Sequence, residues 1–357
     1  MNQSITRRFG ANIPVARVVC AVVLAALSAS FCARPLTAAD GDYHLLKKVV
    51  LGGEGGWDYL ICDSDGRRVY ISRGTHVMVV DADTYAVVGD IPGTDGVHGI
   101  ALAPELGRGF TSNGRANTVT IFDLKTLKVL GTAPTGNGPD AIVYDPASQC
   151  VFTFNGHGGD ATAIDAASGK PVGTVTLGGR PEFAAADGQG HIYNNLEDKS
   201  ELLQIDAQKL TVTARWPLAP GDSPSGLAID REHRRLFAGC HNHMMAVVDA
   251  DSGKVLATPE IGQGVDANAF DPGTQLAFSS NGDGTLNIVH EDSPEKFTAV
   301  ASVATQRGAR TMALDLKTHH VFLVTAEFGP PPAPTAEHPH PWPQTTPGSF
   351  TLLVFGP

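Results

Sequence analysis

The chain has 357 residues and a formal net charge of −11 at pH 7. An acidic protein repels phosphate backbones, so we expect no general nucleic-acid binding, whereas cations are electrostatically easier ligands. Beyond residue 39 three cysteines remain, Cys62, Cys150 and Cys240, and because this number is odd and they fall in three different repeats, a disulfide-built fold is excluded.

The first 39 residues have the order of a bacterial signal peptide. Arg7, Arg8 and Arg17 precede an apolar run over 18–27, and small residues lead up to Ala39. This order predicts cleavage after Ala39 and a periplasmic or secreted protein. An uncleaved anchor is the alternative, but the run is short for a bilayer span. No membrane span is expected in residues 40–357.

Internal repeats dominate the remainder of the chain. Seven segments with the same pattern begin 40 to 44 residues apart, at Trp57, Val97, Pro139, Pro181, Pro224, Val265 and Ala309. Each contains short apolar strands of period two, a Gly or Asn turn, and a third strand that ends in Asp, as at Asp81 or Asp249. A sandwich or barrel would share the alternation, but equal spacing favours radial repetition. We therefore predict an all-β, seven-bladed β-propeller with four-stranded blades over residues 40–357.

The last repeat supplies only three strands of its own, at 311–315, 321–325 and 349–355. The segment 45–52, which precedes the first repeat, looks like the missing fourth strand. We therefore expect the N-terminal strand to complete the last blade and close the ring, which removes an exposed edge. Deletion of residues 43–53 is then expected to destabilise the whole domain.

Two runs carry a resemblance to a known family. Val69-Tyr-Ile-Ser72, and Phe110-Thr-Ser-Asn113 with Asn117-Thr-Val119, stand where YVTN-repeat (YncE-like) propellers have Val-Tyr-Val-Thr-Asn and Asn-Thr-Val. The resemblance spans roughly residues 43–357, and the sixth repeat departs from it by carrying His290 where the others carry Asp. It implies the fold, and it implies that the innermost strand of each blade starts at the mouth of a central channel.

With that geometry, one position of each repeat faces the channel mouth. These seven candidate ligand-binding residues are Asp58, His98, Asp140, Glu182, Ser225, Asp266 and Arg310. Four carboxylates that converge on a narrow mouth repel one another, and a bound cation, Arg310 and His98, or raised pKa values relieve the repulsion. The alternative is a mouth that is polar because water fills it. The flanking Trp57 and Tyr59 could form an apolar wall, although packing between blades is the more usual role of large aromatics.

Histidines on the same predicted face extend the set of metal donors. The turns there carry His76, His157, Cys240, His241 and His243, and the His-x-His pair places two imidazoles on one side of an extended backbone. A divalent metal ion is thus a candidate cofactor, with His98, Asp140, Glu182, Asp266, His241 and His243 as its candidate ligands. Plain exposure of the turn histidines is the alternative.

The seventh repeat carries a proline-rich insertion, residues 328–348, in the corresponding turn. Eight prolines keep it extended, and it brings His338, His340 and Trp342 toward the mouth as a candidate lid or partner contact. Disorder is the alternative.

These features favour a periplasmic binding or interaction module, expected to be a monomer, for a small molecule, a metal or a periplasmic protein partner. A metal-dependent hydrolase of lactonase type that uses the same ring is the alternative, and an electron-transfer partner whose cofactor lies elsewhere is a third. No phosphate loop, G-x-S-x-G elbow, H-E-x-x-H or haem motif is present in the sequence.

Overall fold

The computed structural model describes residues 42–53, 55–331 and 343–357, which lie in one compact unit, Ala38–Pro357. The predicted signal peptide, residues 1–39, and His338, His340 and Trp342 of the predicted lid lie outside the described residues. Within the described ranges the regular structure is 27 β-strands and two single-turn 3-10 helices, so the all-β prediction is confirmed.

Four sheets each contain four consecutive strands that pair antiparallel with their neighbours in the sequence. The first contains β9 (Pro139–Asp145), β10 (Cys150–Asn155), β11 (Asp160–Asp165) and β12 (Lys170–Thr176). The second contains β13 (Pro181–Ala186), β14 (His191–Leu196), β15 (Glu201–Asp206) and β16 (Thr211–Pro217), with η2 (Glu197–Lys199) between β14 and β15. The third contains β17 (Pro224–Asp230), β18 (Arg235–Cys240), β19 (Met244–Asp249) and β20 (Val255–Ala257). The fourth contains β21 (Val265–Asp271), β22 (Leu276–Asn281), β23 (Thr285–Ser293) and β24 (Lys296–Ala304).

The first two repeats form a single seven-stranded sheet. Its strands are β2 (Leu60–Asp63), β3 (Arg68–Ser72), β4 (Gly74–Asp81), β5 (Val87–Ala103), β6 (Arg108–Asn113), β7 (Thr118–Asp123) and β8 (Val129–Pro134), with η1 (Pro104–Leu106) between β5 and β6. The long β5 links two groups of strands, because residues 87–92 pair with β4 and residues 97–103 pair with β6. Each half of β5 thus completes a group of four strands.

The remaining sheet joins the beginning and the end of the described chain. Its order is β1 (His44–Val50), β27 (Thr351–Gly356), β26 (His320–Thr325) and β25 (Met312–Asp315), and β1 runs antiparallel to β27 from His44 opposite Gly356 to Val50 opposite Thr351. Tyr43 anchors the start of β1, since its ring packs edge-on against Phe278 and its hydroxyl donates to the carbonyl of His319 at 2.8 Å.

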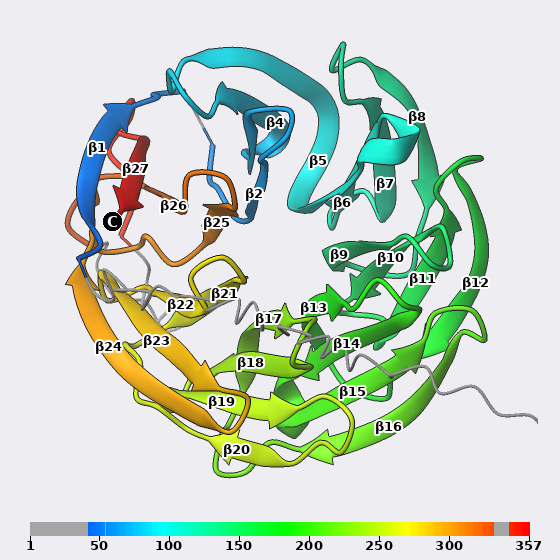
Figure 1. The fold of residues 1–357 in the computed structure, drawn as a ribbon. Helices are drawn as coiled ribbons and strands as arrows, with labels where there is room; N and C mark the ends of the chain where they lie inside the picture. The colour runs from blue at the N-terminus through cyan, green and yellow to red at the C-terminus, as the bar shows by residue number, and fades with distance from the viewer. Residues whose placement is uncertain (1–41, 54, 332–342) are drawn as a thin grey trace, which may run out of the picture. The chain divides into compact units, whose positions relative to one another are not determined.

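Figure 1 shows the sheets of this unit following one another around a centre, with β25 innermost in the sheet that contains β1 and the first strand innermost in each of the other groups. The innermost strands contact one another in succession, β2 with β5, β5 with β9, and so on to β25, which contacts β2. Apolar side chains fill the space between adjacent sheets, as where Phe152 and Phe154 share a cluster with Leu203 and Ile205. This burial is the main source of stability.

The Asp that ends the third strand in five of the repeats also organises the following turn. Asp81 accepts hydrogen bonds from the backbone N–H and the hydroxyl of Thr84, and Asp249 accepts the same pair from Ser252. A short carboxylate that binds the backbone two or three residues on is a common way to fix a tight turn. The repeat of this residue therefore has a local structural cause.

Two further expectations concern the chain as a whole. Cys62, Cys150 and Cys240 are free thiols. Among the described residues, no helix combines the length and the apolar character that a membrane crossing requires.

Candidate functional site

The seven predicted mouth residues lie at or near the start of the innermost strands, and neighbouring polar side chains fix their backbone. The amide of Asp58 donates to Ser72 Oγ at 3.1 Å, and the Thr311 hydroxyl donates to the Asp58 carbonyl at 2.6 Å. Asn194 Nδ2 donates to the carbonyl of Glu182 at 3.0 Å. These contacts set the direction in which each side chain leaves its strand. We call the seven residues the mouth ring.

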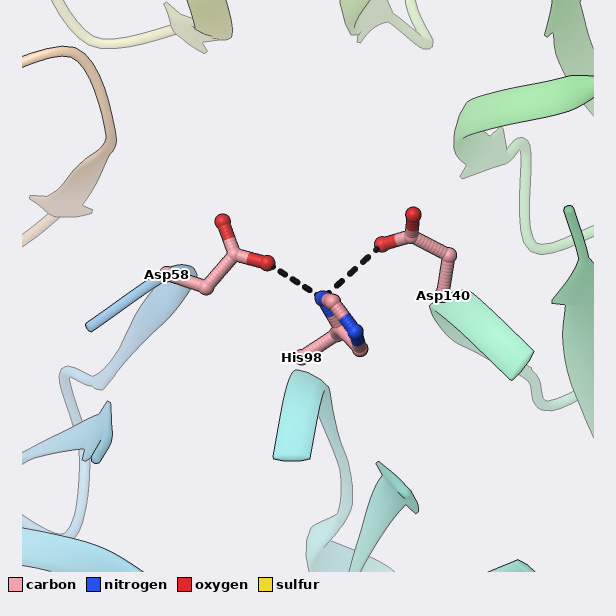
Figure 2. Close-up of side chains that lie close together, drawn as sticks. All are labelled: Asp58, His98 and Asp140. Atoms are coloured by element: carbon pink, nitrogen blue, oxygen red, sulfur yellow. Dashed lines mark hydrogen bonds and ion pairs between the residues drawn. The ribbon is translucent and has the colours of Figure 1, made fainter. Parts of the chain in front are cut away.

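One half of the mouth ring is centred on His98 (Figure 2). Its Nδ1 lies 2.6 Å from Asp58 Oδ2 and 3.5 Å from Asp140 Oδ1. The three residues come from three successive innermost segments, so the contacts tie adjacent repeats together. Burial lowers the pKa of His98, but the hydrogen bond that its Nδ1 donates to Asp58 and the charge of Asp140 outweigh burial and raise the pKa to about 8. His98 is therefore a cation near neutral pH.

The other half of the mouth ring is centred on Asp266. Arg310 Nε lies 2.8 Å from Asp266 Oδ2, and the Ser225 hydroxyl donates to Asp266 Oδ1 at 3.1 Å. Arg310 also approaches Asp58, at 4.0 Å between Nη2 and Oδ1. Arg310 and Asp58 thus connect the two halves, and charge alternates along the chain of contacts.

Glu182 joins the mouth ring from across the centre. The Tyr59 hydroxyl donates to Glu182 Oε1 at 3.4 Å, and the Tyr59 ring packs edge-on against Phe183 with centroids 5.0 Å apart. Tyr59 also lines a cavity of about 340 Å³ between the innermost strands. The preferred prediction for Tyr59, packing between blades, does not describe these contacts, because its side chain spans the centre toward the β13 segment. Trp57, in contrast, packs against Phe350 at 5.5 Å.

Three carboxyl groups of the mouth ring hold protons more tightly than usual. Burial raises the pKa of Glu182 to about 9, and the charges of Asp140 and Asp266 add to this effect. Burial also raises the pKa of Asp266 to about 7 despite Arg310, and that of Asp140 to about 6 despite His98. The ring therefore carries less negative charge at neutral pH than its composition suggests.

A pocket of about 590 Å³ opens beside Asp266 and Arg310. Its other walls include the aromatic rings of Trp57 and Phe328 and the exposed guanidinium of Arg307. Arg307 forms no ion pair with another described residue. The repeat comparison did not indicate Arg307, because it stands three residues before the mouth position and only the spatial arrangement brings it to this wall.

The remaining predicted donors lie apart from the ring contacts. His241 lines the pocket, whereas His76 lies 3.7 Å from Asp90. Cys240 is fully buried, and burial raises the pKa of its thiol to about 12, which makes it a poor source of thiolate. Within the described residues, His157 and His243 share no donor group with the mouth ring.

Within the described residues, two groups of side chains place donor atoms close enough to share a metal ion. One is Asp58, His98 and Asp140 of the mouth ring. The other is Asp230, His233 and Glu291, none of which is among the predicted site residues. Of the predicted metal ligands, Glu182, Asp266, His241 and His243 belong to neither group.

No protein-family model and no curated protein matches this sequence. Solved structures do match its fold. U3-55K aligns with a TM-score of 0.71 at 9% identity over 88% of this chain and 98% of that chain. The RRP9 WD40 repeats align with a TM-score of 0.71 at 9% identity, over 88% of this chain and 97% of that chain. Hydrazine synthase of Kuenenia stuttgartiensis aligns with a TM-score of 0.65 at 14% identity, over 75% of this chain and 92% of that chain.

The chain is a β-propeller. At these identities the likeness concerns the fold alone. In this propeller the mouth ring lies where the innermost strands begin, and the Asp230 group lies where one of them ends.

Proposed function

We propose that this chain is an exported, seven-bladed propeller of YVTN-repeat type that binds a small organic anion at the mouth of its central channel. Export is supported by the charge, apolar run and small residues of residues 1–39. The YVTN assignment is supported by the Val69–Ser72 and Phe110–Asn113 runs. A periplasmic protein is a second possible occupant of the same face.

Strand pairing supports seven blades and a closed ring. The two halves of β5 give the seven-stranded sheet two groups of four strands, and β1 adds the fourth strand to the last group. The contacts of the innermost strands return from β25 to β2. A ring of this kind has a single mouth at which seven inner strands begin.

The pocket beside the mouth ring is the observation that carries the proposed ligand class. Arg310 uses Nε on Asp266, and a guanidinium has further N–H donors that can bind a carboxylate. Arg307 adds a second positive charge, and Trp57 and Phe328 offer flat apolar faces. Two cations next to aromatic rings fit a planar organic acid, with its carboxylate on the arginines and its ring on the aromatics.

The charge of His98 favours an organic ligand over a metal in the mouth ring. A metal ligand must be a neutral imidazole, and His98 Nδ1 is already held between the carboxylates of Asp58 and Asp140. The protonated ring already neutralises Asp58 and approaches Asp140. A metal would have to displace this proton.

The proposal is tested by thermal shift and calorimetry with benzoate and its hydroxyl- and amino-substituted forms as probes. Binding of such an acid should raise the melting temperature. The variants Arg310→Gln and Trp57→Phe should weaken the binding. For Arg310→Gln we expect the affinity to fall about tenfold or more, because a charged hydrogen bond is lost. Arg115→Gln, at an exposed arginine paired only with Asp95, is the matched control. Equal stabilisation of wild type and Arg310→Gln, or no response to any of these acids, would contradict the proposal.

A second candidate, a metal-dependent hydrolase of lactonase type, is favoured by the convergence of Asp58, His98 and Asp140. A divalent ion held there could polarise a carbonyl group. Metal analysis of the purified protein, with lactone hydrolysis measured for wild type and His98→Asn, distinguishes the candidates. Turnover that depends on added metal and on His98 would support the hydrolase, and bound metal without turnover would favour a binding module.

A further inference from the structure

A second group of ionisable side chains joins the third and fourth four-stranded sheets. Asp230 ends β17, His233 lies in the turn before β18, and Glu291 lies near the end of β23. His233 Nδ1 is 2.8 Å from Asp230 Oδ2 and 3.1 Å from Glu291 Oε1. We call these three residues the turn cluster. Ser225 of the mouth ring and Asp230 lie at opposite ends of β17, so the turn cluster is distinct from the mouth ring.

The repeats show that Glu291 is a departure from the common pattern. The position after the third strand's final Asp holds a buried alanine in four other repeats, namely Ala82, Ala166, Ala207 and Ala250. In this repeat it holds Glu291, which is only 3% exposed. A methyl group suffices for packing at this position. A buried carboxyl group there has no structural need and a high desolvation cost.

The neighbouring turn departs from the pattern as well. In three other repeats the residue three positions after the turn aspartate is Ser or Thr, and Thr318, for example, donates to Asp315 Oδ2 at 2.7 Å. His233 occupies this position beside Asp230. The two departures come from different sheets, yet they meet at one point.

The turn cluster also lacks the cation that three other turn aspartates receive from the next repeat. Arg67 lies 2.6 Å from Asp315, Arg234 3.3 Å from Asp187, and His319 2.7 Å from Asp271. The residue that corresponds to these three for Asp230 is Gln275, whose Nε2 donates to the Pro272 carbonyl instead. At the turn cluster, the amide of Gln275 thus stands where three other repeats have a positive charge, and Glu291 adds a second carboxyl group.

The carboxyl group of Glu291 has unused acceptor capacity. Both oxygens are buried, and although Oε1 lies 3.1 Å from His233 Nδ1, neither accepts a well-aligned hydrogen bond from a described residue. Burial and the charge of Asp230 raise its pKa to about 7. Arg235, whose charge also acts on Glu291, is engaged with Asp249 at 2.7 Å and with the Pro294 carbonyl at 2.6 Å. The turn cluster therefore contains two carboxyl groups and one imidazole whose donor atoms lie close enough together to share a cation.

We propose that the turn cluster binds one divalent transition-metal ion, with Zn²⁺ preferred and Mn²⁺ as the weaker alternative, and that the ion links the two sheets. One imidazole nitrogen and two carboxylate oxygens are a donor set that zinc accepts. Ligand atoms around a tetrahedral zinc ion with bonds of about 2.0 Å lie roughly 3.3 Å apart, close to the spacing of His233 from Glu291. His233 is partly exposed, with 30% of its side chain accessible, which gives water and the ion access to the cluster.

The test uses the purified protein, carrying a tag without histidine and stripped with a chelator. Addition of Zn²⁺ should raise its melting temperature, and calorimetry should give a site that requires Glu291 and His233. The variants Glu291→Ala and His233→Ser introduce the residues of other repeats, so both should fold. Each should weaken zinc binding about tenfold or more, since each removes one of three ligands.

His98→Asn separates this site from the mouth ring. If it leaves the zinc affinity and the zinc-induced rise in melting temperature unchanged, the ion binds at the turn cluster as proposed. If it abolishes them while Glu291→Ala does not, the ion binds at the mouth ring and the proposal fails. Absence of both Zn²⁺ and Mn²⁺ binding to the folded wild-type protein would also overturn it.

Discussion

The mouth ring and the turn cluster are both built from carboxylates and histidine, but their charges are balanced differently. In the mouth ring, His98 contacts Asp58, and Arg310 contacts Asp266, so the protein supplies its own cations. In the turn cluster, Asp230 and Glu291 share His233 and no described arginine or lysine lies in ion-pair contact with either. A site that neutralises itself suits a ligand with its own polar groups, whereas an uncompensated site suits a cation.

The pH dependence of stability tests the mouth ring and should give the largest effect. Glu182 has a pKa raised to about 9, so the folded protein holds its proton at pH values where the unfolded chain has lost it. Stability contributed by this proton is therefore lost as pH rises toward 9. Linkage limits this loss to about 1.4 kcal/mol per pH unit, over the range from the ordinary carboxyl pKa of 4.5 up to about pH 9.

Glu182→Gln should flatten that slope, because the amide stays neutral, and urea unfolding at pH 5, 7 and 9 measures it. His98 contributes in the same direction, since stability from its raised pKa is present below about pH 6.5 and is lost as pH rises through about 8. Some slope should thus remain in the variant. An unchanged slope would mean that Glu182 is ionised in the folded protein at neutral pH.

Removal of the mouth ring's arginine should have an intermediate effect. Arg310→Met leaves Asp266 without its cation, and we expect the free energy of unfolding to fall by about 1–2 kcal/mol, less than for a buried pair because the Arg310 side chain is 45% exposed. Denaturation at pH 7 measures the change. Arg310→Lys should recover part of the loss, and no loss in Arg310→Met would show that the Arg310–Asp266 pair contributes nothing to stability.

Removal of a carboxyl group from the turn cluster should have the smallest effect and the opposite sign. In the presence of a chelator, Glu291→Ala should raise the free energy of unfolding by about 1 kcal/mol, because it removes the desolvation cost of a buried carboxyl group, which the approach of His233 at 3.1 Å offsets only in part. The melting temperature with and without Zn²⁺ should rank wild type and variant in opposite orders. A less stable variant under chelation would mean that Glu291 has a partner that stabilises it.

The repeat predicts the propeller fold and the contacts among Asp58, His98 and Asp140 for the same reason. Equivalent positions in a repeat have equivalent places in space, so aligning Asp58, His98 and Asp140 in the sequence was enough to bring them together. Aligning the repeats places a residue on its strand, but it does not show which distant residues a long side chain contacts. For this reason Tyr59, which extends across the centre to Glu182, was assigned to packing between blades.

The turn cluster was overlooked although the sequence contained a signal for it. The departure at His290 was noted, but the more informative residue is Glu291 beside it, where four other repeats have alanine. Its partner His233 lies in a different repeat, and only the packing of adjacent sheets brings the two together. Arg307 gave no signal because its place in the pocket depends on the path of a loop rather than on a repeat position.

The pairing of β1 with β27 has a consequence for how the protein is made. Tyr43 and His319 are bonded across a separation of 276 residues, so the first strand of the domain has no partner until the last one has been synthesised. Contacts of such long range slow folding and leave an unpaired edge exposed in the meantime. A chain that stops short of β27 would keep that edge, and its incomplete sheet would distinguish it from the finished protein.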